Sequence, residues 1–554
     1  MNAHISLSDD ITNVSTKWLI LILAACTVAF GTLTWLWARA LPTHATDSFM
    51  YLWQAEQFLK TPGADWISLM AYLPKSLYSI LLALAGLAGG HLETAGTMVA
   101  LASGLITVIL TGLSMIVLTD VESMSKPRRL RLVAVAGGLT ALHPIFIDYS
   151  GRILSESLFT MLTMLAVFFM ILFYRSTHPT HLFLCAGAVG LSTLTREVGL
   201  AYVPVLAIIP LVGHAARRKR LVLLAGAMLV AVGINLPAMR GDARSSLGQF
   251  NMTVHREQFD LLAREQAAFG LDDTARDFAA NLTTRVSLPE FISKNLGHFL
   301  QRTKANLPTL CVITWRMAGW FLFSLSVAGI GFWIKGGMPP RAGAMTLAFA
   351  AITLFVYLPF HLEFRYLVPI IPFLSIFAAF AVDHLLHAAE RRRTRPWLMP
   401  LLLCVTMGWS YYRTYSIQAA PELNPMNNMT EEKELGTWLR SMIPPGSLIM
   451  ARKPDVPYYA GGDYIILPFA EWRDITTFTC HRRVDYLVLS QRFQQLRPQL
   501  RFLYDSGQVP DNLRLLTDFK AANGIHLYVF KILCPSGEAT APARPEGISA
   551  RFGL

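Results

Sequence analysis

The sequence predicts a polytopic α-helical membrane protein that carries a small α/β domain at its C-terminal end. Hydrophobic residues make up 53% of the 554 residues and charged residues only 15%, with a mean hydropathy of +0.42. Such a composition is too apolar for a soluble multidomain chain and ordinary for a membrane protein. The apolar residues also gather in runs long enough to cross a bilayer, until the chain becomes polar after about residue 417.

Eleven membrane-spanning helices are expected. Nine come from single apolar runs, and two short ones come from the run 182–213, which the turn "TREVG" interrupts. The first run ends in "WARA", which resembles a signal-peptide cleavage site. The run is, however, about 21 residues long, which is longer than the apolar region of a usual signal peptide, so a retained membrane anchor is favoured. The nine single runs are 18–38, 94–119, 131–148, 153–174, 220–239, 309–334, 343–360, 366–386 and 397–416.

Clusters of basic residues predict the orientation of the chain. With a cytoplasmic N-terminus, the clusters "KPRRLR", "RRKR", "KGGMPPR" and "RRRTR" all face the cytoplasm, as the positive-inside rule requires. This parity needs the segment 77–90 to lie at the membrane surface, since a twelve-span arrangement would place the first cluster outside. The charges therefore act as topology signals, and the net charge of +12 does not indicate nucleic-acid binding.

The predicted domains are a membrane domain over 1–416, with outer loops 39–93 and 240–308, and an outer α/β domain over 417–554. The segment 428–446 has helical period, begins with the capping pair Asn428 and Glu431, and stops at a Pro-Pro-Gly turn. Five strand-like runs follow it: "SLIMA", "YIILP", "VDYLVLS", "LRLLTDF" and "HLYVFKI", with the helical "RFQQLRPQLRFLY" between the third and the fourth.

The six cysteines form no C-x-x-C pair, so they indicate neither a zinc site nor a disulfide scaffold. Only Cys480 and Cys534 fall in the outer domain. A disulfide between them and two free thiols are both open.

Ionisable residues at the outer ends of helices are the candidates for chemistry, because charge near hydrocarbon is costly and is kept mainly for function. Together they offer carboxylates and bases at one membrane face, which could hold an anionic head group and a proton acceptor. They occur in five places: Asp47; Lys75; Asp148, Arg152 and Glu156; Arg196 and Glu197; and His361, Glu363, Arg365 and Tyr366.

Each place also has a structural interpretation. Asp47 has the position of a helix cap, and Lys75 that of a lysine reaching to the interface. Arg152 and Glu156 have the i, i+4 spacing of a helical ion pair. Arg196 and Glu197 could lock a turn. Histidines such as His361 are more often satisfied polar residues than metal ligands, and no zinc-ligand spacing is present.

Five segments in order resemble the polytopic glycosyltransferases of the GT-C fold, of the bacterial type related to protein O-mannosyltransferases and the lipid A aminoarabinose transferase. Asp47 follows the first helix, with Tyr51 four residues on, and "PKSLYSILLAL" is a variant of the proline-rich segment of that family. The others are "PIFIDYSGRILSESLF", "LSTLTREVGL" and "EFRYLVPIIPFL", and the C-terminal "IPPGSLIMARKPDVPYYAGG" resembles the outer domain of many bacterial members.

The resemblance implies an enzyme of the inner (cytoplasmic) membrane, with its N-terminus in the cytoplasm and its C-terminus in the periplasm. It would move a hexose or pentose, with inversion, from a polyprenyl-phosphate donor to a lipid, glycan or protein acceptor at the outer face. Asp47 would be the general base, and Glu156 could supply a second acid. The donor phosphate would be bound first by Arg365 and Arg196, and then by Lys75 and Arg152. The remaining residues of the site would be Tyr51, Tyr366, His361 and Glu197.

The chain departs from the family at its first motif. Many members have a second acid and an arginine after the aspartate, whereas here Asp47 is followed by Ser48, Phe49 and Met50. Lys75 also sits one place from the lysine of relatives that carry one, which puts its phosphate role in doubt. No metal ligand is assigned, and a divalent metal is left open as a cofactor. The alternatives are a transporter or flippase of a lipid-linked sugar, a surface-polysaccharide ligase, and a non-enzymatic assembly factor.

Overall fold

A computed structural model describes most of the chain and divides it into two compact units. The helical unit comprises 1–40, 74–247 and 295–423, and the α/β unit comprises 41–73, 248–294 and 424–554. The residues that the structure describes are 15–41, 44–72, 76–119, 125–211, 217–240, 296–335, 340–359, 362–391, 398–419, 430–467, 472–496, 498–504 and 509–534.

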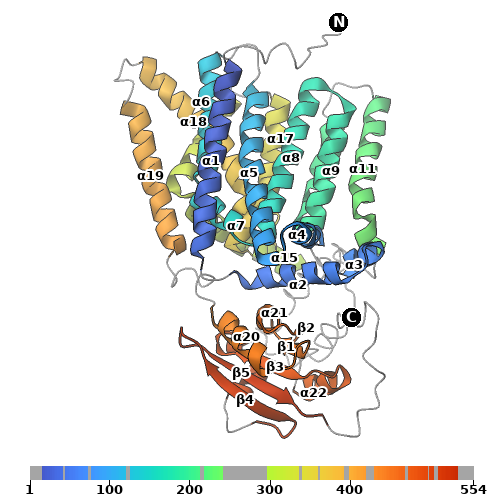
Figure 1. The fold of residues 1–554 in the computed structure, drawn as a ribbon. Coiled ribbons are helices and arrows are strands. Elements are labelled where there is room, and N and C mark those ends of the chain that lie inside the picture. Colours follow the sequence, from blue (N-terminus) through green and yellow to red (C-terminus); the bar gives the residue numbers. More distant parts are fainter. Residues whose placement is uncertain are drawn as a thin grey trace. The chain divides into compact units, whose positions relative to one another are not determined.

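The helical unit is a set of long apolar helices that run alongside one another (Figure 1). By length and composition, five helices of the described residues can cross a bilayer, or up to seven if each of two bent pairs counts as one span. Several shorter apolar helices lie among them. Several membrane-spanning helices are therefore confirmed, and the number eleven stays a prediction. The long helices are α1 (Ser15–Ala40), α5 (Leu92–Thr119), α8 (Ser155–Ser176), α11 (Arg217–Arg240) and α18 (Ile371–Arg391), the last preceded by the 3-10 helix η3 (Phe364–Ile370).

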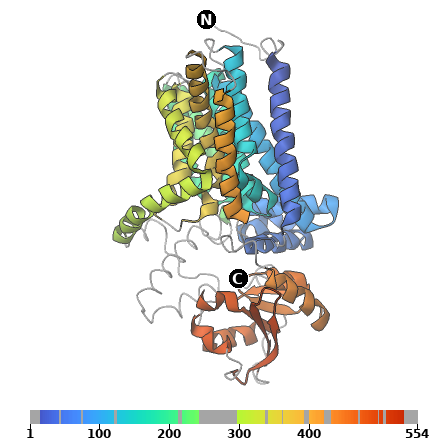
Figure 2. The same cartoon turned by 90° about the vertical axis from the view of Figure 1, so that its left-hand side faces the viewer.

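Two expected spans are broken. The run 131–148 forms α6 (Lys126–Ala141) and α7 (Pro144–Gly151), which meet at 55° because Pro144 lacks an N–H and begins a new helix. The run 309–334 forms α15 (Leu296–Ala318) and α16 (Trp320–Ile334), which meet at 109° around Gly319. Gly319 has φ +75°, a conformation that glycine adopts without strain. Figure 2 shows the yellow-green α15 slanting away from the upright helices.

The run 182–213 is interrupted where the sequence predicted. α9 (Pro179–Thr195) ends at Arg196, and the chain continues as η2 (Glu197–Tyr202) and α10 (Val203–Leu211). The segment expected to lie flat forms α4 (Ser76–Gly89), which Figure 1 shows end-on and therefore crosswise to α5 and α8. The unit is completed by α17 (Pro340–Phe355) and α19 (Leu398–Ala419).

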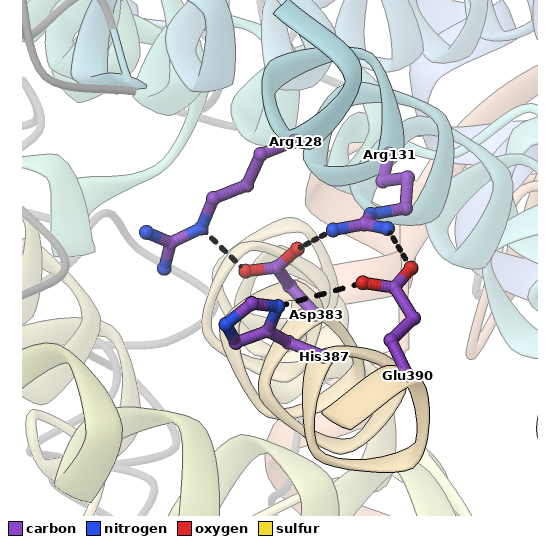
Figure 3. Close-up of polar contacts among 5 residues, drawn as sticks. All are labelled: Arg128, Arg131, Asp383, His387 and Glu390. Carbon is purple, nitrogen blue, oxygen red and sulfur yellow. Dashed lines mark hydrogen bonds and ion pairs between the residues drawn. The ribbon is translucent and has the colours of Figure 1, made fainter. Parts of the chain in front are cut away.

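An ionic cluster joins α6 to α18 at the end of the helical unit where α6 begins (Figures 1 and 3). Asp383 of α18 is buried. Its Oδ2 accepts a hydrogen bond from Arg128 Nε at 2.6 Å, and its Oδ1 forms an ion pair with Arg131 Nη2 at 3.3 Å. Arg131 also reaches the exposed carboxylate of Glu390, at 2.5 Å. The basic cluster "KPRRLR" therefore has a packing role in addition to its predicted role in topology.

The α/β unit is built on a five-stranded sheet in the order β2-β1-β3-β5-β4. β1 pairs in parallel with β2 and β3, and β5 pairs antiparallel with β3 and β4. The five predicted strands and the helical segment between the third and fourth are confirmed. The strands are β1 (Leu448–Ala451), β2 (Asp463–Ile466), β3 (Tyr486–Ser490), β4 (Leu513–Lys520) and β5 (His526–Ile532); the 3-10 helices η5 (Gln491–Leu496) and η6 (Pro498–Tyr504) lie between β3 and β4.

The helices of this unit are α2 (Thr46–Lys60), η1 (Gly63–Asp65), α3 (Trp66–Tyr72), α20 (Glu431–Met442), α21 (Asp455–Ala460) and α22 (Trp472–His481). α20 ends two residues before Pro444, as predicted, because proline disfavours helical backbone in the residue before it. The predicted cap Asn428 lies outside the described residues, and the residue directly before α20 is Thr430. Cys480 and Cys534 form a disulfide.

Alternating side chains of the strands fill two cores, one on each face of the sheet. Met450 and Leu487 belong to the core that α22 covers, and Ile449 and Val488 belong to the core that α20 and α21 cover. Trp53 of α2 packs against the second core. The segment that follows the first membrane helix therefore folds together with residues from the far end of the chain.

Candidate functional site

A buried carboxylate lies at the point where three chain segments of the helical unit meet. Glu156 is in the first turn of α8, where the helix dipole favours a negative charge, and it is 2% exposed. Arg196 Nη1 lies 2.7 Å from Glu156 Oε1, and Arg365 Nε lies 3.9 Å from the same oxygen. The other carboxylate oxygen, Oε2, is buried and has no hydrogen-bond partner among the described residues.

The two arginines occupy breaks between helices. Arg196 has extended backbone between α9 and η2. Arg365 is the second residue of η3, and the residue before this helix, Glu363, is extended. A break of this kind lets a long side chain turn to a neighbouring helix instead of following its own helix surface. Glu363 also holds Arg365, with Oε2 at 2.6 Å from Nε.

Tyr366 supports both guanidinium groups through its ring. The guanidinium carbons of Arg196 and Arg365 lie 5.0 and 5.4 Å from the ring centroid, within the range of cation–π contacts. Tyr357 stacks on Tyr366 with the ring centroids 4.9 Å apart. The cluster is therefore held by packing as well as by charge.

Arg152 does not form the helical ion pair with Glu156 that its spacing predicted. α7 ends at Gly151 and α8 begins at Ser155, so the i, i+4 geometry of a helix does not apply across this break. Instead Arg152 Nε donates to Asp148 Oδ1 at 2.7 Å, and both side chains are buried. Trp37 Nε1 donates to the same oxygen at 2.7 Å.

Asp47 lies in the α/β unit, in the first turn of α2. Its Oδ1 is 2.6 Å from Lys453 Nζ, in the loop after β1, and both side chains are about one-quarter exposed. The N-cap of α2 is Ala45, and Asp47 follows it two residues later, inside the helix. Tyr51 is buried one turn further on.

Comparison with known proteins shows which fold these sites belong to. The structure of ArnT from Cupriavidus metallidurans bound to undecaprenyl phosphate matches with a TM-score of 0.53 over 96% of this chain and 100% of that chain, at 14% sequence identity. The apo structure of the same protein matches with a TM-score of 0.51 over 93% and 98%, at 13% identity.

This protein has the GT-C glycosyltransferase fold. The Alg9-like mannosyltransferase family matches residues 302–438, about a quarter of the chain. No curated protein sequence matches it. The GT-C resemblance and the fold class expected from the sequence motifs are therefore confirmed.

In the GT-C chain, the predicted site residues fall into separate groups. Glu156, Arg196, Arg365 and Tyr366 come together in the helical unit, and Glu197 begins η2 next to them in sequence. Asp47 and Tyr51 belong to the α/β unit. Lys75 and His361 lie outside the described residues.

Lys453 is the residue that the sequence analysis missed. It is 406 positions from Asp47, and a lysine in the loop "ARKPD" has no local pattern that distinguishes it from an ordinary surface lysine. Only the folding of α2 onto the C-terminal residues reveals the pair.

The described residues include no group of three His, Cys, Asp or Glu side chains that could hold a metal ion. Asp47, Glu156 and Asp148 each face a cation of the protein itself.

Proposed function

We propose that this protein is an inverting glycosyltransferase that moves a sugar from a polyprenyl-phosphate donor to an acceptor at the outer face of the cytoplasmic membrane. One observation carries the proposal: the arginines of a GT-C fold converge on a buried carboxylate at helix breaks. ArnT, which has this fold, was solved with undecaprenyl phosphate, a polyprenyl phosphate. A protein that accepts such a lipid needs cations for its phosphate.

Arg365 and Arg196 would have different roles at the phosphate. Arg196 is nearly buried and sits 2.7 Å from Glu156, so most of its charge is already compensated. Arg365 is also paired, with Glu363 at 2.6 Å, but both of these side chains are partly exposed, at 19% and 26%, so an incoming anion can reach Arg365 more easily than Arg196. We therefore assign Arg365 to the donor phosphate and Arg196, with Glu156, to holding Arg365 and Tyr366 in position.

The transfer is a displacement at the anomeric carbon of the donor sugar. The acceptor oxygen forms a bond to this carbon from one side, and the bond to the phosphate oxygen breaks on the other, which inverts the configuration. The bonding electron pair leaves with the lipid phosphate, whose growing negative charge a guanidinium stabilises. Asp47 takes the proton of the acceptor hydroxyl, and Lys453 orients the Asp47 carboxylate for this step.

The test is transfer of radiolabelled sugar by the purified full-length protein in lipid nanodiscs. Synthetic polyprenyl-phosphate donors carrying a hexose or a pentose are offered with lipid, glycan and peptide acceptors. We expect one donor to be consumed and a product of inverted configuration to form. Asp47→Asn should lower the rate by about 100-fold or more, since a general base contributes about 10² to 10⁴.

Asp65→Asn is the matched control, because Asp65 is an exposed acid of the same unit. It should retain the wild-type rate. Failure of every donor, or equal activity of Asp47→Asn and wild type, would contradict the proposal. Movement of the intact lipid-linked sugar across the bilayer without transfer would point to the flippase alternative, and transfer of whole oligosaccharides only would point to the ligase.

A further inference from the structure

The α/β unit contains a cavity of about 30 Å³ at the carboxyl ends of its parallel strands. Its wall includes the last residues of β1 and β3 and the residue after β2. Ligands of sheets with parallel strands bind preferentially at this edge, where loops and side chains converge. The volume admits about two water molecules, or the hydroxyl-bearing edge of a ligand, but not a whole sugar ring.

Glu432 lines the cavity from the first turn of α20. Its residue is 5% exposed, and neither carboxylate oxygen has a hydrogen-bond partner among the described residues. Its neighbour on α20 differs, since Glu431 is paired with Arg492 and accepts from Asn523 Nδ2 at 2.7 Å. Burying a carboxyl group without hydrogen-bond donors costs folding free energy, and a bound ligand that donates to it would offset this cost.

The rest of the lining is mixed in charge. Arg452 and Lys453 supply donors, and Asp455 supplies a second buried acid. Ser490 Oγ is buried and, among the described residues, also lacks a hydrogen-bond partner. Acids and bases in one small cavity disfavour both a simple anion and a simple cation, and they suit a neutral ligand whose hydroxyl groups donate and accept.

Aromatic side chains complete the wall. Phe493 lines the cavity beneath Arg452, whose guanidinium carbon is 4.1 Å from the ring centroid. Tyr504 lines it as well and donates to the Ser490 carbonyl at 3.3 Å. Rings of this kind offer an apolar surface next to the polar groups, as the C–H face and the hydroxyl edge of a sugar require.

We infer that this cavity is a carbohydrate subsite that binds hydroxyl groups of the acceptor. Glu432 and Ser490 would accept or donate hydrogen bonds to a sugar, and Lys453 links the cavity wall to Asp47. The assignment to the acceptor rests on the proposed transfer function. The binding of a sugar by the cavity does not, and the experiment measures binding without a donor.

The experiment is saturation-transfer NMR on the full-length protein in detergent micelles. The probes are the methyl glycosides of glucose, mannose, galactose and xylose, with glucosamine and inorganic phosphate as ionic probes. We expect at least one neutral glycoside to bind the wild type. Glu432→Gln should weaken its binding by about tenfold or more, because the amide nitrogen replaces an acceptor oxygen and leaves a sugar hydroxyl in the cavity without its acceptor.

Three variants make the result specific. Glu434→Gln is the matched control on the same helix, since Glu434 already accepts from the Ala522 N–H at 2.8 Å and from Thr430, and it should bind as wild type does. Ser490→Ala should weaken binding, as Glu432→Gln does. Arg365→Ala should lose transfer and keep glycoside binding, which separates failure of this inference from failure of the proposed function.

The thermal midpoint of the ligand-free protein adds a second readout. Glu432→Gln should unfold at an equal or higher temperature than wild type, because the change removes a buried acid that has no partner. A lower midpoint would show a structural role for Glu432 and overturn the inference. Binding of no neutral glycoside, binding of glucosamine or phosphate alone, or equal binding by Glu432→Gln and wild type would overturn it as well.

Discussion

Lys453 Nζ lies 2.6 Å from Asp47 Oδ1, although 406 positions separate the two residues. The pair joins the first turn of α2 to the loop after β1, and both side chains remain partly exposed. A carboxylate that is oriented by one ammonium group, and still reachable, can accept a proton from a substrate.

We expect Lys453→Met to lower kcat by about tenfold while the KM for the donor stays nearly unchanged, because in the proposed mechanism Lys453 positions the base and Arg365 binds the donor phosphate. The measurement is kcat and KM of radiolabelled sugar transfer at a single pH. Lys453→Arg should restore part of the rate. A wild-type kcat for Lys453→Met would contradict the positioning role.

Substitution of the two arginines near Glu156 should have different effects, with Arg196 affecting the stability of the protein and Arg365 affecting the binding of the donor. Arg196→Ala leaves Glu156 buried without its 2.7 Å partner, and breaking a buried pair costs about 3 to 5 kcal/mol. Arg365→Ala should change the thermal midpoint little and weaken polyprenyl-phosphate binding by about tenfold or more. Thermal unfolding in detergent and lipid binding by native mass spectrometry test both. Equal effects of the two changes on both readouts would contradict the division of roles.

The cluster in Figure 3 is expected to support the fold and not the chemistry. Asp383→Ala removes the shared partner of Arg128 and Arg131 and should cost about 1 to 3 kcal/mol in stability, because both arginines are partly exposed and water offsets part of the loss. Glu390→Gln is the control, because Glu390 is about half exposed and an exposed pair contributes about 0 to 1 kcal/mol. Folded protein of either variant should retain the wild-type KM for the donor. A changed KM in Asp383→Ala would tie the cluster to substrate binding.

The two buried acids of the cavity, Asp455 and Glu432, should make the α/β unit more stable at mildly acidic pH than at neutral pH. Burial raises the pKa of Asp455 to about 6, and burial together with the carboxylates of Asp455 and Glu431 raises the pKa of Glu432 well above its usual range. A carboxyl group with a raised pKa binds its proton more tightly in the folded state. For Asp455, this contribution to the free energy of unfolding is fully present below the pKa of the unfolded chain, about 4. It is lost as the pH rises through the pKa of the folded protein, about 6.

The measurement for this prediction is the urea or thermal midpoint between pH 4 and pH 7. The wild type should lose stability across this window, and Asp455→Asn combined with Glu432→Gln should flatten the loss. Asp511→Asn, at an exposed acid of the same unit, should keep the wild-type slope. A wild type whose stability rises between pH 4 and pH 6 would contradict the assignment.

Much of the fold follows from patterns that are local in sequence. The length of the apolar runs predicts the long helices. The run 182–213 is too long for one helix and contains the polar turn "TREVG", which predicts the break at Arg196. Short strand-like runs predict all five strands. The breaks at Pro144 and Gly319 were missed, because an apolar run predicts a span by hydropathy and says nothing about its direction.

The sequence by itself determined the composition of the membrane part, the α/β character of the C-terminal part, and the residue types from which a phosphate-binding and proton-accepting site can be built. Only the tertiary structure decided the pairs: Glu156 with Arg196 and not Arg152, and Asp47 with Lys453. Propensity and hydropathy act over a few residues and can be read along the chain. Ion pairs between distant segments depend on where helices break and which surfaces pack, and these are properties of the folded molecule.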